Sequence, residues 1–398
     1  MPLTFAEAAG RLARAGEPAV PETVDGLLRA AVDAGASDLH LEPGVQDVEL
    51  RLRIDGVLRP AGTLEGRYRA NLVARLKVLA DLVTYRSDLP QEGRIPRERV
   101  GLPVDLRVST FPTLWGEKAV VRIFDPARMS LSLDALGLPE ADRILLEERL
   151  RRPGGTILLT GPSGSGKTTL IYAALRRLLE LGGRGRHIVT VEDPIEQAIP
   201  GITQTQVHPA VGLTFGASLR SLLRQDPEVI VIGEVRDRET ARIAIEAGLT
   251  GHQVITTLHS GCAAGAFTRL LEMEIEPYLL TSSIALVTAQ RLVRVLCPSC
   301  RVSAPVPTYA GALAAIGGRE AWAARGCADC RGSGYRGRTL LTELLAVGDA
   351  VREAVRARRD SGAIHAAALA DGMTPLAESA CALVLCGRTD PVEALRVL

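Results

Sequence analysis

Strand-like alternation of apolar and polar positions dominates the first third of the chain. The segments with this pattern are 38–41, 48–54, 57–58, 101–110 and 118–124. Two stretches with apolar residues at helical spacing, 24–34 and 69–82, lie among them. Mixed strands and helices of this kind predict one α+β domain over residues 21–128. Residues 1–20 are weakly patterned, so we expect a flexible extension there.

Continuous apolar runs replace this alternation in the middle of the chain. The runs lie at 156–160, 187–192, 229–233 and 253–258, with helix-like segments between them. Strands without polar alternation are buried on both faces, as in a parallel sheet covered by helices. We therefore predict an α/β core over residues 134–296. The last segment, 339–398, has a helical pattern.

Composition and charge narrow the class of protein. The 398 residues suffice for two or three domains. The 47 basic and 46 acidic residues give a net charge of +1, so no overall field attracts nucleic acid or an anionic membrane. Aromatic residues make up only 3%, which leaves few platforms for stacked bases, and we expect no nucleic-acid partner. Because the chain has no long apolar window and no signal-peptide pattern, we expect a soluble cytosolic protein.

A glycine-rich turn between a predicted strand and a helix-like segment carries the chemistry of phosphate binding. Glycine lets successive backbone N–H groups turn toward phosphate oxygens, and the opening helix adds partial positive charge. Lys167 would meet the β- and γ-phosphates, and Thr168 a magnesium ion. A chance glycine-rich turn is the alternative. The residues predicted to hold the nucleotide here are Gly161, Pro162, Ser163, Gly164, Ser165, Gly166, Lys167, Thr168 and Thr169.

Two of the apolar runs end in carboxylates. Glu234 follows 229–233 at the sheet edge where a nucleotide would lie, and suits orienting or deprotonating the attacking water. Glu192 belongs to a cluster of three carboxylates, which a divalent cation would make tolerable beside a triphosphate. We therefore predict Mg²⁺ held by Thr168, Glu192 and Glu234, directly or through water. The alternative is that both carboxylates are surface residues after buried strands.

Four of the seven cysteines form two Cys-x-x-Cys pairs, Cys297 with Cys300 and Cys327 with Cys330. Four thiolates suit a tetrahedral Zn²⁺ with no open position, which predicts a structural metal element over residues 297–338. The odd number of cysteines does not fit a disulfide framework. A pair of redox dithiols is the alternative.

Four motifs in order resemble the ATPases of type II secretion and type IV pilus assembly systems. They are the glycine-rich turn, the run Thr-Val-Glu-Asp-Pro-Ile-Glu at 190–196, the segment 219–228 leading into Gly-Glu-Val-Arg-Asp, and the histidine motif 250–259. The resemblance runs from about residue 22 to the C-terminus. It implies a RecA-like P-loop core, a PAS-like N-terminal domain, and a short form without the further N-terminal domain through which many relatives bind an adaptor.

The resemblance also implies roles for two histidines. His252 and His259 are seven residues apart across a short predicted strand, so they lie near its opposite ends and do not form a metal-ligand pair. By resemblance, His259 contacts the γ-phosphate region and senses its loss, with His252 nearby. A structural histidine that bonds to the backbone is the alternative for His252.

Four arginines are candidates for nucleotide contact. By resemblance, Arg94 and Arg107 reach the triphosphate from the smaller domain, which would couple hydrolysis to closure of the domains. Arg220 and Arg224 are four residues apart on one predicted helix and share a face, which suits phosphates or the acidic edge of a neighbouring subunit. In so arginine-rich a chain, a solvated surface role is the alternative for each of them.

These features together predict a hexameric ATPase that uses ATP, Mg²⁺ and a structural Zn²⁺. By resemblance, it powers pilin or pseudopilin assembly through an inner-membrane platform protein, at the inner face of the cytoplasmic membrane. A membrane-anchored cytoplasmic adaptor is a further candidate partner. The cysteine pairs favour assembly, because the retraction members of the family lack them. A retraction ATPase and a nucleic-acid motor on the same type of core are the alternatives.

Overall fold

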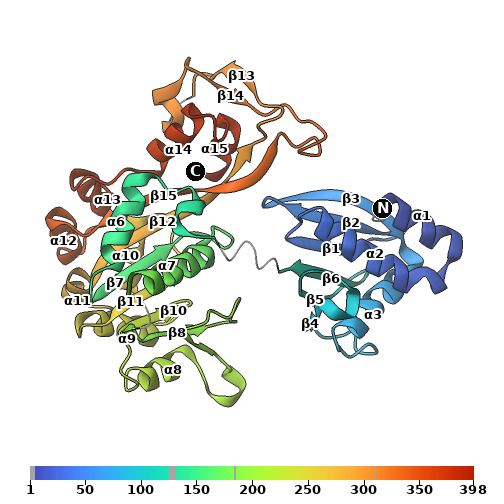
Figure 1. The fold of residues 1–398 in the computed structure, drawn as a ribbon, viewed down its shortest axis with the longest axis horizontal. Coiled ribbons are helices and arrows are strands. Elements are labelled where there is room, and N and C mark those ends of the chain that lie inside the picture. Colours follow the sequence, from blue (N-terminus) through green and yellow to red (C-terminus); the bar gives the residue numbers. More distant parts are fainter. Residues whose placement is uncertain (1–4, 125–130, 183–184, 310) are drawn as a thin grey trace. The chain divides into compact units, whose positions relative to one another are not determined.

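The chain folds into two compact units, Met1–Ala127 and Arg128–Leu398 (Figure 1). The structure, a computed structural model, describes residues 5–124, 131–182, 185–309 and 311–398. Each unit has its own sheet and its own apolar core, as expected of separate domains. No helix among these residues is long and apolar enough to cross a membrane.

The N-terminal unit is a six-stranded antiparallel sheet in the order β3-β2-β1-β6-β5-β4. Its strands are β1 (Asp38–Pro43), β2 (Asp47–Ile54), β3 (Val57–Glu65), β4 (Gln91–Ile95), β5 (Leu106–Thr113) and β6 (Gly116–Ile123). Its helices are α1 (Phe5–Ala15), α2 (Val20–Asp33), α3 (Arg69–Leu79) and α4 (Arg97–Val100), with short 3₁₀ turns at Glu17–Ala19 and Gly66–Tyr68. Alternate residues of β1, Leu39 and Leu41, pack with Leu27 of α2 and Leu72 of α3 in one core, which confirms the α+β prediction.

The start of the chain differs from the predicted flexible extension over residues 1–20. Residues 5–15 form α1, and its Leu12 is only 1% exposed in the core of the N-terminal unit. Alanine, leucine and arginine are strong helix formers, which explains the helix in an Ala/Arg-rich segment. The burial of Leu12 depends on tertiary contacts that the local pattern does not show.

The C-terminal unit is built on a seven-stranded sheet in the order β15-β12-β7-β11-β10-β8-β9. Its strands are β7 (Gly155–Thr160), β8 (Ile188–Glu192), β9 (Thr203–Gln206), β10 (Val229–Ile232), β11 (Gln253–Leu258), β12 (Ile284–Leu296) and β15 (Tyr335–Ala346). All neighbours pair in parallel except β15, which is antiparallel to β12. The four apolar runs predicted as strands are thus confirmed as β7, β8, β10 and β11.

Helices cover both faces of this sheet (Figure 1). Ile157 and Leu159 of β7 pack on one face with Leu175 of α7, whereas Leu158 between them packs on the other face with Phe267 of α10. The helices are α6 (Glu140–Leu150), α7 (Lys167–Gly182), α8 (Phe215–Leu222), α9 (Arg238–Leu249), α10 (Ala263–Glu272), α11 (Pro277–Ser283), α12 (Asp349–Arg356), α13 (Ser361–Ala370), α14 (Leu376–Leu385) and α15 (Pro391–Val397). Two-sided burial explains why the parallel strands are continuously apolar.

Two strands of this sheet were not predicted, namely β12 and the edge strand β15. Thr288 and Gln290 of β12 are fully buried polar residues, and they interrupt the apolar run by which buried strands are found. Residues 339–346 were predicted to be helical but belong to β15. The error arises because a short buried apolar segment has no periodicity that separates strand from helix.

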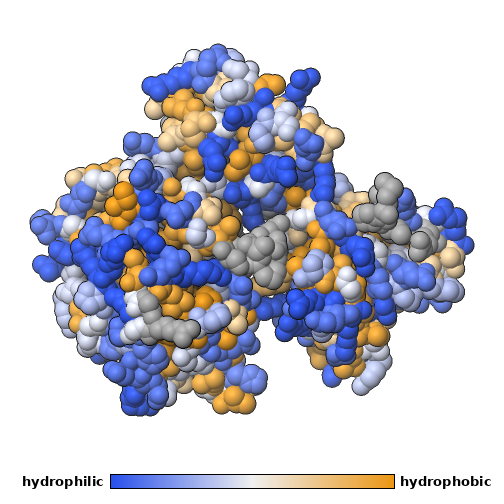
Figure 2. Space-filling view, viewed as in Figure 1, coloured by the Kyte–Doolittle hydropathy of each residue, from blue (hydrophilic) through white to orange (hydrophobic). Residues whose placement is uncertain are grey.

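A small subdomain connects β12 to β15. It contains the antiparallel pair β13 (Val302–Pro305) and β14 (Glu320–Ala323), with a 3₁₀ segment at Gly311–Ile316. Val306 and Leu313 of this subdomain share a core with Val384 of α14 and Ala394 of α15. Figure 1 shows β13 and β14 beside these two helices. In the space-filling view, hydrophilic residues surround scattered apolar ones on the visible surface (Figure 2).

Candidate nucleotide site and cysteine cluster

The glycine-rich turn emerges from the middle of the sheet, between the end of β7 and the first residue of α7. Gly161 has a φ of +140° and Gly166 a φ of +90°, a backbone region that side chains disfavour. A Cβ at Gly161 would lie 2.5 Å from the backbone oxygen of Gln290. Positive φ favours glycine at both positions and close packing requires it at Gly161. We call residues 161–168 the phosphate loop, and its binding of phosphate stays a prediction.

Lys167, the first residue of α7, holds its ammonium within this loop. Its Nζ donates hydrogen bonds to the carbonyl oxygens of Gly161 (2.8 Å) and Pro162 (3.0 Å). Burial lowers the pKa of Lys167, the charge of Glu234 acts to raise it, and the charge of Arg291 acts to lower it. The structure thus places Glu234 and Arg291 within electrostatic range of the phosphate-loop lysine.

Glu234 and His259 meet at the carboxyl edge of the sheet. Glu234 follows β10 and His259 follows β11, and these two strands are parallel neighbours. His259 Nε2 lies 2.9 Å from Glu234 Oε1. The hydroxyl of Thr257 also donates to the carbonyl of Gly233 at 2.7 Å, which fixes the two strand ends together. The predicted neighbours Lys167, Glu234 and His259 are therefore assembled around one loop.

Arg236 is a charged partner of this site that the sequence analysis missed. Its Nε donates to Glu234 Oε2 at 2.8 Å, and its guanidinium lies 3.7 Å from a carboxylate oxygen of Asp193. The next residue, Asp237, caps α9 by accepting a hydrogen bond from the N–H of Thr240 at 2.8 Å. The sequence could have indicated this contact, because Arg236 stands two residues after Glu234 in the run Gly-Glu-Val-Arg-Asp. In an extended segment, residues two apart lie on the same side.

Glu192 has a different environment from Glu234. It is only 6% exposed, and it accepts hydrogen bonds from the hydroxyls of Tyr172 (2.5 Å) and Thr190 (2.6 Å) and from Gln204 Nε2 (3.0 Å). Burial and the bond to Glu192 raise the pKa of the Tyr172 hydroxyl, which therefore stays protonated. Glu192 thus ties the end of β8 to α7 and β9, and its role as a magnesium ligand stays a prediction.

His252 is placed where it cannot meet the phosphate loop of its own subunit. It precedes β11, and the loop follows β7, whose residues Gly155–Thr160 pair in parallel with Gln253–Leu258. At about 3.3 Å per residue, the strand separates His252 from the loop edge by about 20 Å. His252 Nδ1 instead lies 3.1 Å from the carbonyl oxygen of Ala247. The prediction that His252 adjoins the nucleotide is wrong within one subunit, because the histidines occupy opposite sheet edges.

Arg220 and Arg224 do not share a helical face. Arg220 forms an ion pair with Glu239 of α9, and α8 ends at Leu222. Arg224 lies in the turn beyond the helix and donates to the backbone oxygen of Arg220 at 2.8 Å. The helix is shorter than its apolar pattern indicated, so the shared-face argument fails.

Arg94 and Arg107 lie opposite each other on β4 and β5 of the N-terminal unit and share one face of its sheet. Arg94 forms an ion pair with Asp105 at 2.6 Å, and the guanidinium of Arg107 stacks 5.2 Å from the centre of the Phe124 ring. Their approach to a triphosphate bound by the C-terminal unit stays a prediction.

The four cysteines of the two Cys-x-x-Cys pairs converge on one point. Their sulfur atoms all lie within 4.8 Å of one another, and Cys297 to Cys327 and Cys300 to Cys330 are 3.9 Å and 3.8 Å apart. A tetrahedral ion with Zn–S bonds of about 2.3 Å requires sulfur separations of about 3.8 Å. The cluster therefore has the dimensions of a structural tetrathiolate site.

Backbone groups stabilise the thiolate form within this cluster. Burial would raise the pKa of Cys330, but the N–H groups of Cys327 and Gly334, each 3.1 Å from its sulfur, lower the pKa to about 6. The two pairs follow the end of β12 and precede β15, so the cluster closes the connection between adjacent strands. Such a site shapes the fold and offers no open position for catalysis.

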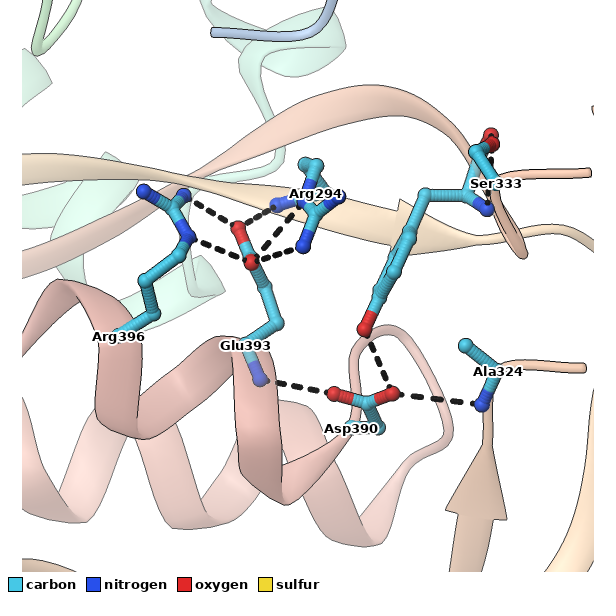
Figure 3. A network of polar contacts seen from close by, with 7 residues as sticks. Arg294, Ala324, Ser333, Asp390, Glu393 and Arg396 are labelled. Atoms are coloured by element: carbon cyan, nitrogen blue, oxygen red, sulfur yellow. Dashed lines mark hydrogen bonds and ion pairs between the residues drawn. The ribbon is translucent and has the colours of Figure 1, made fainter. Parts of the chain in front are cut away.

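A buried polar network joins β12 and the start of β15 to the C-terminal helix α15 (Figure 3). Glu393 is fully buried and accepts hydrogen bonds from the guanidinium groups of Arg294 and Arg396. The Tyr335 hydroxyl donates to Asp390 at 2.7 Å, and Asp390 caps α15. Although burial would raise the pKa of Glu393, these arginines lower it to about 2. The network therefore stabilises the packing of β12 and β15 against α15.

Comparison with known proteins identifies the family of the chain. A family model described as "Type II/IV secretion system protein" matches residues 13–396. Type II secretion system protein E of Aeromonas hydrophila is 43% identical over 378 residues, covering 94% of this chain and 74% of that protein. Type II secretion system ATPase E of Vibrio cholerae is 44% identical over 345 residues, covering 86% of this chain and 68% of that protein.

The fold is shared with a solved structure. The X-ray structure of the Legionella pneumophila ATPase DotB superposes with a TM-score of 0.68 at 22% sequence identity and covers 95% of both chains. This likeness confirms the P-loop ATPase fold predicted for the core. On the family match and the identity to its members over most of their length, the chain belongs to the family of type II/IV secretion system proteins.

Proposed function

We propose that this protein hydrolyses ATP to power the assembly of pilins or pseudopilins in a type II secretion or type IV pilus system. The observation that carries the proposal is the convergence of Lys167, Glu234 and His259 at one glycine-lined loop. The loop binds the phosphates through its N–H groups. Glu234 then orients the attacking water and accepts its proton, while His259 and Arg236 hold the carboxylate in place.

The loop fits a nucleotide with Mg²⁺. The positive φ angles of Gly161, Gly164 and Gly166 turn the backbone into a concave cradle, and Lys167 adds a cation at the start of α7. Thr168 and Glu234 are the residues that would hold Mg²⁺, which supplies charge neutralisation on the phosphates when bound. Gln204 and Tyr172 engage Glu192, so we assign it a lesser part.

Turnover and nucleotide binding by two variants test this proposal. Lys167→Ala removes the loop cation, so binding of ATP and ADP should fall at least about 10-fold. Glu234→Gln keeps the shape of the site but removes the base, so kcat should fall at least about 100-fold while ATP still binds. Arg269→Gln, on the exposed surface of α10, is the control and should match the wild type. Normal turnover by Glu234→Gln would refute the assignment of the base.

We further propose that the cysteine cluster holds one Zn²⁺ per chain and that the protein acts as a homohexamer. The sulfur separations support the metal, and family membership supports the ring and the partner, an inner-membrane platform protein at the cytoplasmic face. Metal analysis should find one zinc per chain, and Cys300→Ser should lose it. Sedimentation with a non-hydrolysable ATP analogue should show six subunits. A chain free of zinc, or one that stays monomeric with nucleotide, would contradict the respective part.

A further inference from the structure

The short segment from His259 to the start of α10 is anchored from three neighbouring strands at successive backbone groups. The Thr160 hydroxyl of β7 donates to the carbonyl of Ser260 at 3.1 Å. Arg291 of β12 donates to the carbonyl of Gly261 at 2.6 Å. Glu343 of β15 accepts a hydrogen bond from the N–H of Ala263 at 2.7 Å. The segment that carries His259 therefore has its path fixed by other strands and not by its own hydrogen bonds alone.

The β7 anchor, Thr160, precedes the phosphate loop in the chain, whereas the β12 anchor lies next to a residue that contacts the loop from a neighbouring strand. Gln290, the residue before Arg291, is fully buried and donates from Nε2 to the carbonyl of Ser165 at 2.9 Å. The backbone oxygen of Gln290 packs against Gly161 at the other end of the loop. Two consecutive residues of one strand thus hold the phosphate loop and the histidine segment.

The guanidinium of Arg291 fits this position for a geometric reason. It donates to Gly261 and, at 3.1 Å, to the backbone oxygen of Gln290. A planar group with several fixed N–H donors can satisfy two carbonyls at once, and the ammonium of lysine has no such planar fork. Its positive charge also acts to lower the pKa of Lys167.

We propose that Arg291 is a positioning residue for hydrolysis: it fixes the segment after His259 relative to the phosphate loop, so that His259 meets Glu234. The inference rests on the proposed function, because it assigns Arg291 to the same reaction. It differs from a direct phosphate contact, in which Arg291 would act on the nucleotide without His259.

Kinetics of Arg291→Gln on the full chain separate these two roles. Loss of a hydrogen bond to a charged group should lower kcat about 10-fold or more, while the Kd for ADP stays within about 2-fold of the wild type. Arg291→Lys, which keeps the charge but has a single donor nitrogen, should recover part of the loss. Arg269→Gln on α10 is the matched control, since this exposed arginine forms an ion pair with Glu272, and its kcat should be unchanged.

A double-mutant cycle with His259→Gln decides whether Arg291 acts through the histidine. If it does, Arg291→Gln should lower kcat by less than about 2-fold in the His259→Gln background. Additive losses in the two variants would overturn the proposal in favour of a direct phosphate contact. An unchanged kcat in Arg291→Gln would overturn it as well.

Hydrogen exchange tests the positioning without relying on turnover. The amides of Ala263 and Gly265 are hydrogen-bonded, so a peptide covering residues 259–267 should be protected. Arg291→Gln should speed exchange in this peptide about 10-fold, and Arg269→Gln should leave it unchanged. Unchanged exchange in Arg291→Gln would overturn the inference. A wild type without ATPase activity would instead refute the proposed function, with the exchange result still valid for Arg291.

Discussion

The edge of the sheet at the phosphate loop and the junction of β12, β15 and α15 both contain a glutamate held by arginine, but they use it differently. Glu234 at the loop is 20% exposed and shares its oxygens with two exposed side chains, His259 and Arg236. Glu393 at the junction is fully buried, and guanidinium groups cover both of its oxygens. The comparison teaches that a partly exposed carboxylate keeps lone pairs for chemistry, whereas a buried, saturated one fixes structure.

The largest expected effect comes from removing the buried glutamate. Glu393→Ala leaves Arg294 and Arg396 without their acceptor, so the unfolding free energy of the C-terminal unit should fall by about 3–5 kcal/mol. Glu353→Ala, at an exposed position of α12, is the matched control and should change stability by less than about 0.5 kcal/mol. Denaturant unfolding followed by circular dichroism measures both. Equal unfolding free energies of Glu393→Ala and Glu353→Ala would contradict the structural role given to Glu393.

A second comparison uses the two histidines at the opposite ends of β11. His259→Ala should lower kcat about 10-fold to 100-fold, because Glu234 loses the partner of one oxygen. His252→Ala removes a contact to the backbone of α9, far from the loop, so its kcat should stay within about 2-fold of the wild type. Steady-state ATPase assays of the two variants measure this difference in kcat. A large loss of kcat in His252→Ala would mean that this histidine reaches a nucleotide across a subunit boundary.

Glu192 combines features of Glu234 and Glu393. It ends β8 at the same edge of the sheet as Glu234, but it is buried, as Glu393 is. Glu192→Gln should cost about 1–3 kcal/mol of stability, since the amide cannot accept from Tyr172, Thr190 and Gln204 as the carboxylate does. Its kcat should fall less than that of Glu234→Gln. Thermal unfolding and turnover on the same samples measure the two effects. A turnover loss equal to that of Glu234→Gln, at unchanged stability, would show Glu192 acting on the nucleotide.

A further effect is expected at acid pH. The arginines lower the pKa of Glu393 from its ordinary value of 4.5 to about 2, so the folded chain favours the carboxylate. This stability is complete above about pH 4.5 and is lost as the pH falls toward 2. Unfolding between pH 5 and 2.5 should therefore show a steeper loss in the wild type than in Glu393→Ala. Parallel acid curves for the two proteins would contradict the lowered pKa.

Much of the fold could be predicted from the sequence, and the predictions that failed did so for physical reasons. The strands β7, β8, β10 and β11 were predictable because two-sided burial leaves them continuously apolar. The four cysteines were predictable because tetrathiolate spacing is a local signal. The buried polar residues Thr288 and Gln290 concealed β12. Because β12 was not predicted, the contact of Arg291 with the segment after His259 was not predicted either. Contacts between segments so distant in the chain leave no local sequence pattern.

Roles that depend on geometry were the least predictable. Spacing showed that His252 and His259 occupy opposite ends of a strand, yet only the parallel pairing of β11 with β7 shows which end faces the loop. Arg236 escaped notice because an exposed arginine is unremarkable until its partners, Glu234 and Asp193, are seen. Arg224 was predicted to lie on the same helix as Arg220, but α8 ends at Leu222. Helix ends depend on tertiary contacts as much as on the local pattern.

The four sulfurs at the foot of the β12–β15 pair have a consequence for protein engineering. They lie within 4.8 Å of one another at the two ends of the segment that connects β12 to β15, and the pairing of these strands shifts register between Arg294 and Leu296. An excursion with clamped ends changes length at small entropic cost, since doubling a loop adds only about 0.6 kcal/mol. A peptide tag or a reporter domain inserted between the exposed Gly317 and Gly318, away from the buried Val306 and Leu313, would therefore leave the strands β7, β10 and β11 in place.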